Sequence, residues 1–340
     1  MTPREAVIAL ASPRDLSREE AASVMRAIMT GEATPAQVGA ILTALSMKGA
    51  KSDELAGFAG AMREFAVPFP HKIAGPCIDT CGTGGDESGT FNVSTAAAFV
   101  VAGAGLPVVK HGNRSVTSRC GSADVLTALG ARLEIPPEGM AGVLRSTGIA
   151  FLYAPLYHPA MKRVAGIRQE LGLRTVFNLL GPLTNPAGAR IQLLGVYRPD
   201  AIATMAGVLQ LLGAERAMVV HGGGLDEITS TGPTRVAEIG ESGIREYTIE
   251  PGDFGIPLSD LADLRGGDAS ENARILREVL SGERGAARDA VLMNAGAAIY
   301  LGGLARSMGG GISLAEESID SGMALRKLEA FVGRTAGASP

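Results

Sequence analysis

Apolar side chains recur at three- and four-residue intervals through residues 1–67, which is the spacing of one face of a helix. Residues 17–20 form a capping box, and Thr34 places a capping residue ahead of a first-turn proline. Gly31 and Gly49 stand where two of the apolar patterns end. The spacing predicts three short helices in a small bundle suited to scaffolding or dimerisation, with a core from Val24, Met25, Ile28, Val38, Ile41, Leu42, Leu45, Leu55, Phe58, Met62 and Phe65.

From about residue 77 the pattern changes to short apolar runs that end in glycine turns, each followed by a helix or a polar loop. Three such runs lie at residues 77–79, 106–109 and 217–220. The repeated order of strand, glycine turn and helix is typical of a largely parallel sheet covered by helices. A further helix is expected at residues 161–173, followed by a connector that contains Pro182 and Pro186.

The length favours two domains, because 340 residues is about twice the size of a common single domain. We predict an α/β protein with a small all-helical domain at residues 1–69 and a larger α/β domain at residues 70–340. Hydrophobic residues make up 46% of the chain and charged residues 19%, which excludes a disordered chain. Glycine is in excess at 46 residues, which indicates tight turns and close approach of the backbone to a ligand.

Net charge, cysteine usage and the length of apolar stretches indicate the compartment and the kinds of partner. The net charge of −4 gives no general attraction for nucleic acid. Cys77, Cys81 and Cys120 follow no disulfide framework, which favours a reducing compartment. The longest apolar stretch, residues 96–109, is shorter than a bilayer span and contains glycine and proline. We therefore expect a cytoplasmic protein that binds neither membrane nor nucleic acid.

Two loops at predicted strand ends carry the features of phosphate binding. Residues 82–86 hold three glycines, so that backbone N–H groups could face an anion, and the positive end of the helix that follows would lie beside them. The loop is neither a Walker sequence nor a dinucleotide fingerprint. Asn92, Ser94 and Thr95 place polar side chains in the first turn of that helix, although each alone could be an N-cap.

The second loop, residues 110–115, follows the next predicted strand. It offers a lysine, an arginine and, with the residues after it, several hydroxyl groups, and Ser122 is expected to cap the next helix. A Lys–Arg pair in a loop is more often a solvated surface. Two such loops on neighbouring strands nevertheless predict a phosphorylated ligand with several anionic groups.

Asp226 and Glu227 follow a third strand. Adjacent carboxylates are also found in exposed acidic loops, but beside two phosphate-type loops they favour Mg²⁺, which takes a few carboxylates plus waters and phosphates. Arg168, on the helix at residues 161–173, could bind a carboxylate as a two-pronged fork. A single helical arginine is otherwise a common surface residue.

These motifs resemble the anthranilate phosphoribosyltransferases, which belong to the nucleoside phosphorylase-like phosphoribosyltransferases. The resemblance covers nearly the whole chain and runs through residues 79–86, 90–95, 110–124, 177–186 and 224–228. It implies a helical and an α/β domain, with a helical segment around residues 163–185 joining the small domain. It also implies a homodimer formed through the helical domain and two Mg²⁺ ions per subunit.

The resemblance implies three sets of site residues. The Mg²⁺ ligands would be Ser94, Asp226 and Glu227, and the anthranilate contacts Gly82, Asn113 and Arg168. No general base is assigned, and His111 is the one candidate for a local helper. Many members carry paired histidines where this chain has Tyr157 and His158. Tyr157 can still stack and donate a hydrogen bond there, so only the fine shape of the aromatic pocket is expected to differ. The site for 5-phosphoribosyl 1-diphosphate (PRPP) would comprise Gly82, Gly85, Asp86, Thr90, Asn92, Val93, Ser94, Thr95, Lys110, His111, Gly112, Asn113, Arg114, Ser115, Val116, Thr117, Ser118 and Ser122.

The implied reaction is transfer of the phosphoribosyl group of PRPP to the amine of anthranilate, with diphosphate leaving, in tryptophan biosynthesis. Cleavage at an anomeric carbon is expected to pass through an oxocarbenium-like transition state. Two alternatives stay open at this point. One is a pyrimidine-nucleoside phosphorylase, although its glycine and lysine motifs are absent from the sequence. The other is a nucleic-acid-binding relative without the activity, which the acidic balance and the carboxylate pair disfavour.

Overall fold

The N-terminal region is a helical bundle. The computed structural model describes residues 1–12, 14–70, 75–115 and 119–337, so the predicted site residues Val116, Thr117 and Ser118 lie outside the described residues. Three of the bundle helices were predicted, and a fourth precedes them. Its signal was a capping box in which Thr2 and Glu5 bind each other's backbone N–H groups. The bundle helices are α1 (Pro3–Ala11), α2 (Arg18–Thr30), α3 (Pro35–Lys48) and α4 (Ser52–Glu64).

Local sequence explains where the predicted bundle helices begin and end. The side chains of Ser17 and Thr34 cap α2 and α3, each in a capping box. Gly31 ends α2 in a left-handed conformation with φ +86°, which a residue with a side chain rarely adopts. These caps confirm the boundaries expected from the sequence.

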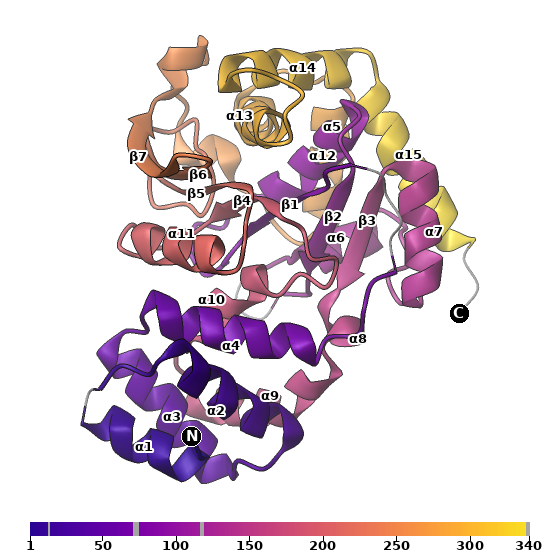
Figure 1. Cartoon of the computed structure of the whole chain (residues 1–340). Coiled ribbons are helices and arrows are strands. Elements are labelled where there is room, and N and C mark those ends of the chain that lie inside the picture. Colours follow the sequence, from indigo (N-terminus) through magenta and orange to yellow (C-terminus); the bar gives the residue numbers. More distant parts are fainter. Residues whose placement is uncertain (13, 71–74, 116–118, 338–340) are drawn as a thin grey trace.

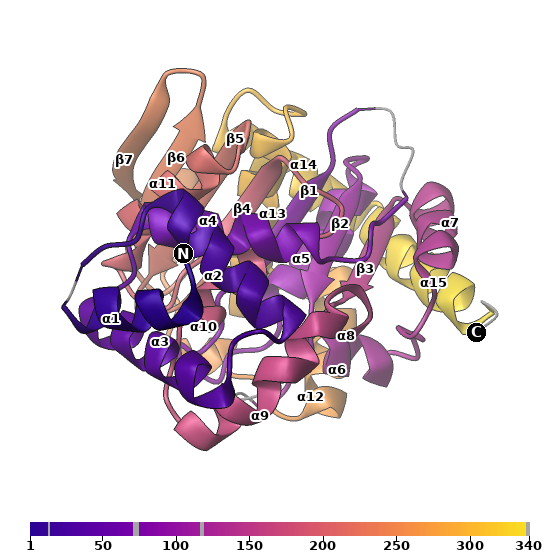
Figure 2. The ribbon, with the colours of Figure 1, turned by 60° about the horizontal axis from the view of Figure 1, so that its bottom comes forward.

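The α/β domain is built on one seven-stranded sheet in the order β3-β2-β1-β4-β5-β6-β7 (Figure 1). Strands β3, β2, β1, β4 and β5 are parallel, and β6 and β7 continue the sheet antiparallel as a hairpin at its margin (Figure 2). The prediction of a largely parallel sheet is confirmed. The strands are β1 (Ile78–Gly82), β2 (Val108–Gly112), β3 (Ile149–Tyr153), β4 (Ile191–Gly195), β5 (Arg216–Gly222), β6 (Thr234–Gly240) and β7 (Gly243–Ile249).

Helices cover both faces of this sheet and give it two hydrophobic cores. One core contains the apolar side chains of α5, α12, α13, α14 and α15. The other runs without interruption from the bundle through α4 and α11 to the opposite face of β4 and β5. The helices of the α/β domain are α5 (Val93–Gly103), α6 (Ser122–Ala128), α7 (Pro137–Thr147), α8 (Ala154–Tyr157), α9 (Lys162–Leu171), α10 (Phe177–Leu180), α11 (Ala201–Leu211), α12 (Ala269–Leu280), α13 (Ala286–Leu301), α14 (Met308–Asp320) and α15 (Met323–Ala336).

The segment between β3 and β4 returns to the bundle, as Figure 1 shows. Helix α9 packs on α2 and α3, and α10 packs on α4. The Ser46 hydroxyl on α3 donates a 2.8 Å hydrogen bond to the carbonyl oxygen of Arg174, between α9 and α10. The exact domain limits stay a prediction, but this packing brings the predicted helix at residues 161–173 against the small bundle. No helix in the described ranges has the length and apolar character needed to span a bilayer.

Candidate active site

The loop after β5 closes over the carboxyl ends of β1 and β4. A Cβ added to Gly195, the last residue of β4, would lie 1.6 Å from the carbonyl oxygen of Asp226. A Cβ added to Gly82, at the end of β1, would lie 2.2 Å from Asp226 Oδ2. Only glycine leaves room at these two strand ends, and so the sequence lets the acidic loop settle directly on the sheet.

This closure brings three of the predicted motifs together. The backbone N–H of Gly84 donates to Asp226 Oδ2 at 2.7 Å, and the N–H of Ser94 donates to Glu227 Oε1 at 3.1 Å. Lys110 reaches the same place from β2, because its Nζ donates to Ser94 Oγ at 3.2 Å and to the carbonyl of Thr80. The glycine loop, the first turn of α5 and the acidic pair therefore share one site.

Electrostatics at the acidic pair favour a bound cation. Burial raises the pKa of Asp226, and the charge of Asp86 raises it further. Burial also raises the pKa of Glu227, and the neighbouring Asp226 adds to the rise, while the Lys110 charge opposes it. Crowded carboxylates of this kind are relieved by a metal ion.

The donor set suits Mg²⁺. Two carboxylates and the Ser94 hydroxyl would leave further positions to water and phosphate oxygens, which is how Mg²⁺ is usually held. The described ranges contain no group of three or more His, Cys, Asp or Glu side chains placed to ligate a metal. The site therefore suits a metal ion whose remaining coordination positions are filled by oxygens of a bound ligand, and not by protein side chains alone.

The glycine loop presents backbone N–H groups that have no acceptor among the described residues. Gly84 and Gly85 have φ of +65° and +80°, which suits glycine. Among the described residues, no acceptor pairs with the N–H groups of Gly85, Asp86 and Glu87. Successive unpaired N–H groups in such a turn form a concave anion site. Thr90 lies beyond the loop, with its Oγ1 3.2 Å from Ser88 Oγ.

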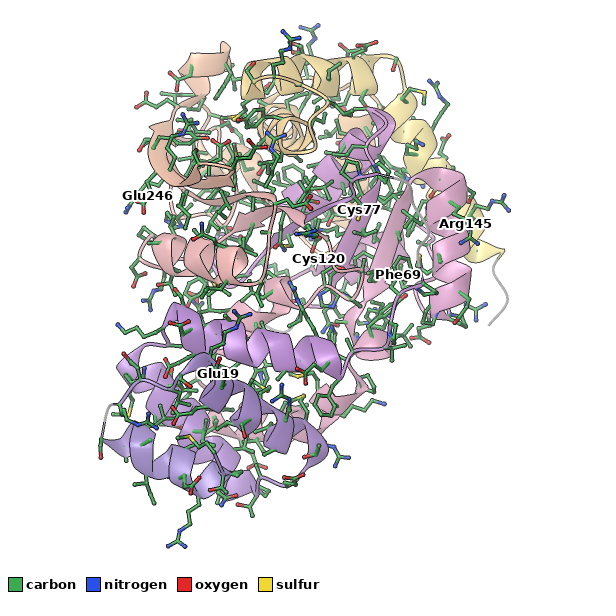
Figure 3. All side chains as sticks on the ribbon, viewed as in Figure 1. Glu19, Phe69, Cys77, Cys120, Arg145 and Glu246 are labelled. Carbon is green, nitrogen blue, oxygen red and sulfur yellow. The ribbon has the colours of Figure 1, made fainter. Side chains whose placement is uncertain are left out.

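The start of α5 differs from the simplest expectation. Asn92 occupies the N-cap position but makes no capping hydrogen bond, so the N-cap interpretation is wrong for its side chain. Its amide instead donates to the carbonyl of Cys120 (labelled in Figure 3) and accepts from Asn272 Nδ2 at 3.0 Å. Glu227 takes the capping role at Ser94. Val93 is buried in the core, and the Thr95 hydroxyl is buried without a hydrogen-bond partner in the described chain.

The second loop is shaped by Asp124. Its carboxylate accepts the N–H groups of Ser115 and Gly121, both at 2.9 Å, and pairs with Arg114 at 3.2 Å. Ser122 is the first residue of α6 and Gly121 holds the N-cap position, so the prediction that Ser122 caps the helix is wrong. The Ser122 hydroxyl points back to the carbonyl of Asn113 at 3.4 Å, which keeps it beside the loop. A Cβ at Gly112 would lie 2.4 Å from that hydroxyl.

His111 lies on the side of the sheet that faces the connector. Its Nδ1 is 3.2 Å from the carbonyl oxygen of Gly181, and its Nε2 is buried without a partner in the described chain. Burial and the nearby His158, whose ring centroid is 5.1 Å away, lower the pKa of His111 to about 3. The imidazole is therefore neutral, and it presents an unused nitrogen.

Tyr157 is buried in the core beside the site. Its ring is 1% exposed and packs edge-on against Phe69, with centroids 6.1 Å apart. Its hydroxyl has no hydrogen-bond partner in the described chain. The side chain therefore packs in the core, and the hydrogen bond expected of its hydroxyl stays a prediction.

Arg168 is a partly buried cation on α9. The guanidinium on α9 stacks over the Phe177 ring at 5.3 Å, and burial lowers its pKa. No carboxylate in the described chain forms an ion pair with it. A planar cation in this state suits a carboxylate ligand.

Several residues at this site were missed from the sequence. Asp79 is fully buried and accepts hydrogen bonds from the N–H of His111 and from Asn185 Nδ2. Burial raises the pKa of Asp79 to about 6. Arg174 reaches from the segment before α10 to the carbonyl of Gly85. Asp79 lies inside one of the resembling blocks, which could have pointed to it, whereas Arg174 lies outside all of them and has no such signal.

Two family models match the chain in order. The "Glycosyl transferase family, helical bundle domain" matches residues 4–66, and the "Glycosyl transferase family, a/b domain" matches residues 74–325. The anthranilate phosphoribosyltransferase of Moorella thermoacetica is 57% identical over 320 residues, which cover 93% of this chain and 94% of that protein. That of Methanocorpusculum labreanum is 54% identical over 328 residues, 96% of either chain.

Solved structures agree with these relatives. Anthranilate phosphoribosyltransferase from Thermus thermophilus superposes with a TM-score of 0.92 at 46% identity, covering 97% of this chain and 99% of that one. The enzyme from Saccharomyces cerevisiae in complex with PRPP and Mg gives a TM-score of 0.90 at 32% identity over 98% of both chains. Since identity exceeds one half over almost the full length and both domains match, this chain belongs to the anthranilate phosphoribosyltransferases of the glycosyl transferase family.

Proposed function

We propose that this protein transfers the phosphoribosyl group of PRPP to the amine of anthranilate, which yields N-(5-phosphoribosyl)anthranilate and diphosphate in tryptophan biosynthesis. The observation that carries the proposal is the meeting of Asp226 and Glu227 with the anion-binding glycine loop at one edge of the sheet. A diphosphate bound through Mg²⁺ fits both parts of this site, because the carboxylates would bind the metal ion and the glycine loop would bind the phosphate oxygens. The membership in the family and the PRPP–Mg complex of the yeast relative support the same donor.

Different groups of the donor site would bind the metal ion and the diphosphate. Asp226, Glu227 and Ser94 would hold Mg²⁺, proposed as two ions per subunit, which would neutralise the leaving diphosphate. The N–H groups at residues 85–87, which have no acceptor in the described part of the chain, and the Lys110 ammonium would stabilise the same charge as it develops. The remaining predicted donor contacts complete the pocket, and among them Val116, Thr117 and Ser118 lie outside the described residues.

The acceptor side needs orientation more than proton transfer. An arylamine is largely unprotonated at neutral pH, so no strong general base is required. The neutral state of His111 agrees with this, because an imidazole with so low a pKa is a weak base. Arg168 would bind the carboxylate of anthranilate, with Asn113 and Gly82 beside it. The amine could then approach the anomeric carbon as diphosphate leaves.

The proposal also includes the oligomeric state, the number of Mg²⁺ ions and the location in the cell. A homodimer would form through the helical bundle, where Ile8 and Met47 are 60% and 84% exposed, and sedimentation at graded concentration tests it. Magnesium titration counts the ions. Cell fractionation tests the cytoplasmic location.

The direct test follows the loss of anthranilate fluorescence with enzyme, PRPP and Mg²⁺. We expect loss that requires all three components. Incubation with a pyrimidine nucleoside and inorganic phosphate is the control for the phosphorylase alternative, and we expect no base release. No loss of fluorescence at any magnesium concentration would refute the proposal.

A further inference from the structure

We propose that Arg174 is a positioning residue for the donor site, and that it holds the carbonyl of Gly85 so that the next backbone N–H faces the diphosphate. The inference rests on the proposed function, because it names diphosphate as the anion. Arg174 lies outside the predicted site and outside the carboxylate pair. Its role is argued from three contacts and from the geometry of one peptide group.

The guanidinium of Arg174 has three partners on two different segments. Its Nη2 donates to the carbonyl of Gly85 and to Glu87 Oε1 at 2.7 Å. Its plane lies over the ring of Tyr197, 4.8 Å from the centroid. Tyr197 also donates its own N–H to Thr83 Oγ1 at 3.1 Å. The arginine and the tyrosine therefore hold the glycine loop at two points.

The contact with Gly85 fixes the direction of a peptide group. In a trans peptide the carbonyl and the following N–H point in opposite directions. Since the Gly85 carbonyl faces Arg174, the N–H of Asp86 faces away from it, and this N–H has no partner in the described chain. Gly85 has φ +80° and no side chain, so the peptide could otherwise rotate and turn its carbonyl towards an anion. Arg174 disfavours that rotation.

The ion pair with Glu87 cannot be the main purpose of the contact. The two side chains are 40% and 81% exposed, and exposed pairs of this kind add little to stability. Glu87 has φ +59° and is the one non-glycine residue in the described chain with positive φ. Such a conformation costs free energy, and strained residues of this kind cluster at functional sites. The carbonyl contact, which shapes the loop, is therefore the one expected to matter.

The backbone of Arg174 is held in place by a hydrogen bond and by buried neighbouring residues. The Ser46 hydroxyl on α3 donates to its carbonyl at 2.8 Å, and Thr175 and Val176 on its C-terminal side are buried. The side chain therefore extends from a fixed point on the bundle side to the donor loop. A long side chain held at both ends can orient a flexible glycine turn.

The test compares binding of PRPP with saturating Mg²⁺ by calorimetry. Arg174→Gln should weaken PRPP about tenfold, about 1.4 kcal/mol, and leave the dissociation constant of anthranilate within about twofold. Arg174→Lys should recover part of the loss. Glu87→Gln, which removes the charge partner and keeps the carbonyl contact, should weaken PRPP binding less than Arg174→Gln does.

Arg190→Gln is the matched control. Arg190 is also exposed, and it also binds a backbone carbonyl and a glutamate, those of Gly213 and Glu215, next to the opposite end of β4. It should bind PRPP normally. Wild-type-like binding by Arg174→Gln, or an equal loss in Glu87→Gln, overturns the inference. If Arg174→Gln unfolds, Arg174→Lys with wild-type melting and wild-type PRPP affinity overturns it. Failure of the wild type to bind PRPP contradicts the proposed function instead.

Discussion

Replacing Gly195 by alanine should disable the site through a single methyl group. The added Cβ would lie 1.6 Å from the carbonyl oxygen, 2.3 Å from the carbonyl carbon and 3.1 Å from the Cα of Asp226. Real Cβ atoms essentially never lie within 3.0 Å of another group, so something must shift by about 1.4 Å. Because β4 is paired with β1 on one side and β5 on the other, we expect the Asp226 backbone to be the part that moves. Gly195 does not have a positive φ, and alanine would fit its backbone without strain. The whole effect therefore comes from the displaced acidic loop.

A shift of this size is large for a catalytic group. Misplacement by about 1 Å can lower a rate about 100-fold, so we expect kcat to fall by about that factor. Overpacking should also lower the free energy of unfolding by about 1–3 kcal/mol. Initial rates at graded Mg²⁺ and thermal melting measure the two effects separately.

Gly60→Ala is the control for this prediction. Gly60 lies in α4 with no atom within 4 Å of an added Cβ, so alanine should keep full activity and stabilise the fold by about 0.4–1 kcal/mol. If Gly195→Ala keeps the wild-type kcat and magnesium dependence, the contact between β4 and the acidic loop does not position Asp226, and the reasoning is refuted.

Four further predictions concern the same site. Asp226→Asn or Glu227→Gln should leave the metal-free fold at least as stable as the wild type, because one of two crowded charges is removed. Either variant should abolish the rise in melting temperature that Mg²⁺ gives the wild type. An unchanged rise contradicts the metal assignment. In the metal-free wild type, burial raises the pKa of both carboxyls, so the folded state keeps protons that the unfolded chain releases. The free energy of unfolding should then fall as the pH rises towards neutral, Mg²⁺ should remove this slope, and a flat metal-free profile would count against it. Arg168→Ala should raise the KM for anthranilate at least about tenfold, and Arg168→Lys should raise it less. A rise confined to the KM for PRPP would reject the acceptor role. Gly85→Val should raise the KM for PRPP with an unchanged circular dichroism spectrum, because a branched residue at φ +80° distorts the anion loop, and an unchanged KM would disprove this.

The architecture could be predicted from the sequence because its signals are local. Capping boxes at α2 and α3 and the order of strand, glycine turn and helix depend on residues a few positions apart. The same rules failed at α1, whose capping box lies ahead of a helix of only 9 residues, too short for a clear apolar pattern.

The finer features of the site depend on partners far along the chain. Local spacing predicts an N-cap at Asn92, but Glu227, 133 residues beyond Ser94, takes the N–H that a cap would bind. Arg174 is 89 residues from Gly85, and nothing in either neighbourhood indicates the other. Tyr157 has a pocket position in the resemblance, and only the structure shows that its ring is buried against Phe69.

The central claim is that one site joins anthranilate to the phosphoribosyl group of a magnesium-bound diphosphate donor. The most direct measurement is a mass balance by liquid chromatography and mass spectrometry after incubation with anthranilate, PRPP and Mg²⁺. We predict one N-(5-phosphoribosyl)anthranilate and one diphosphate for each anthranilate consumed, with both products lost in Asp226→Asn at the same magnesium concentration. Diphosphate released without the anthranilate adduct, or the adduct formed equally by Asp226→Asn, would contradict the account.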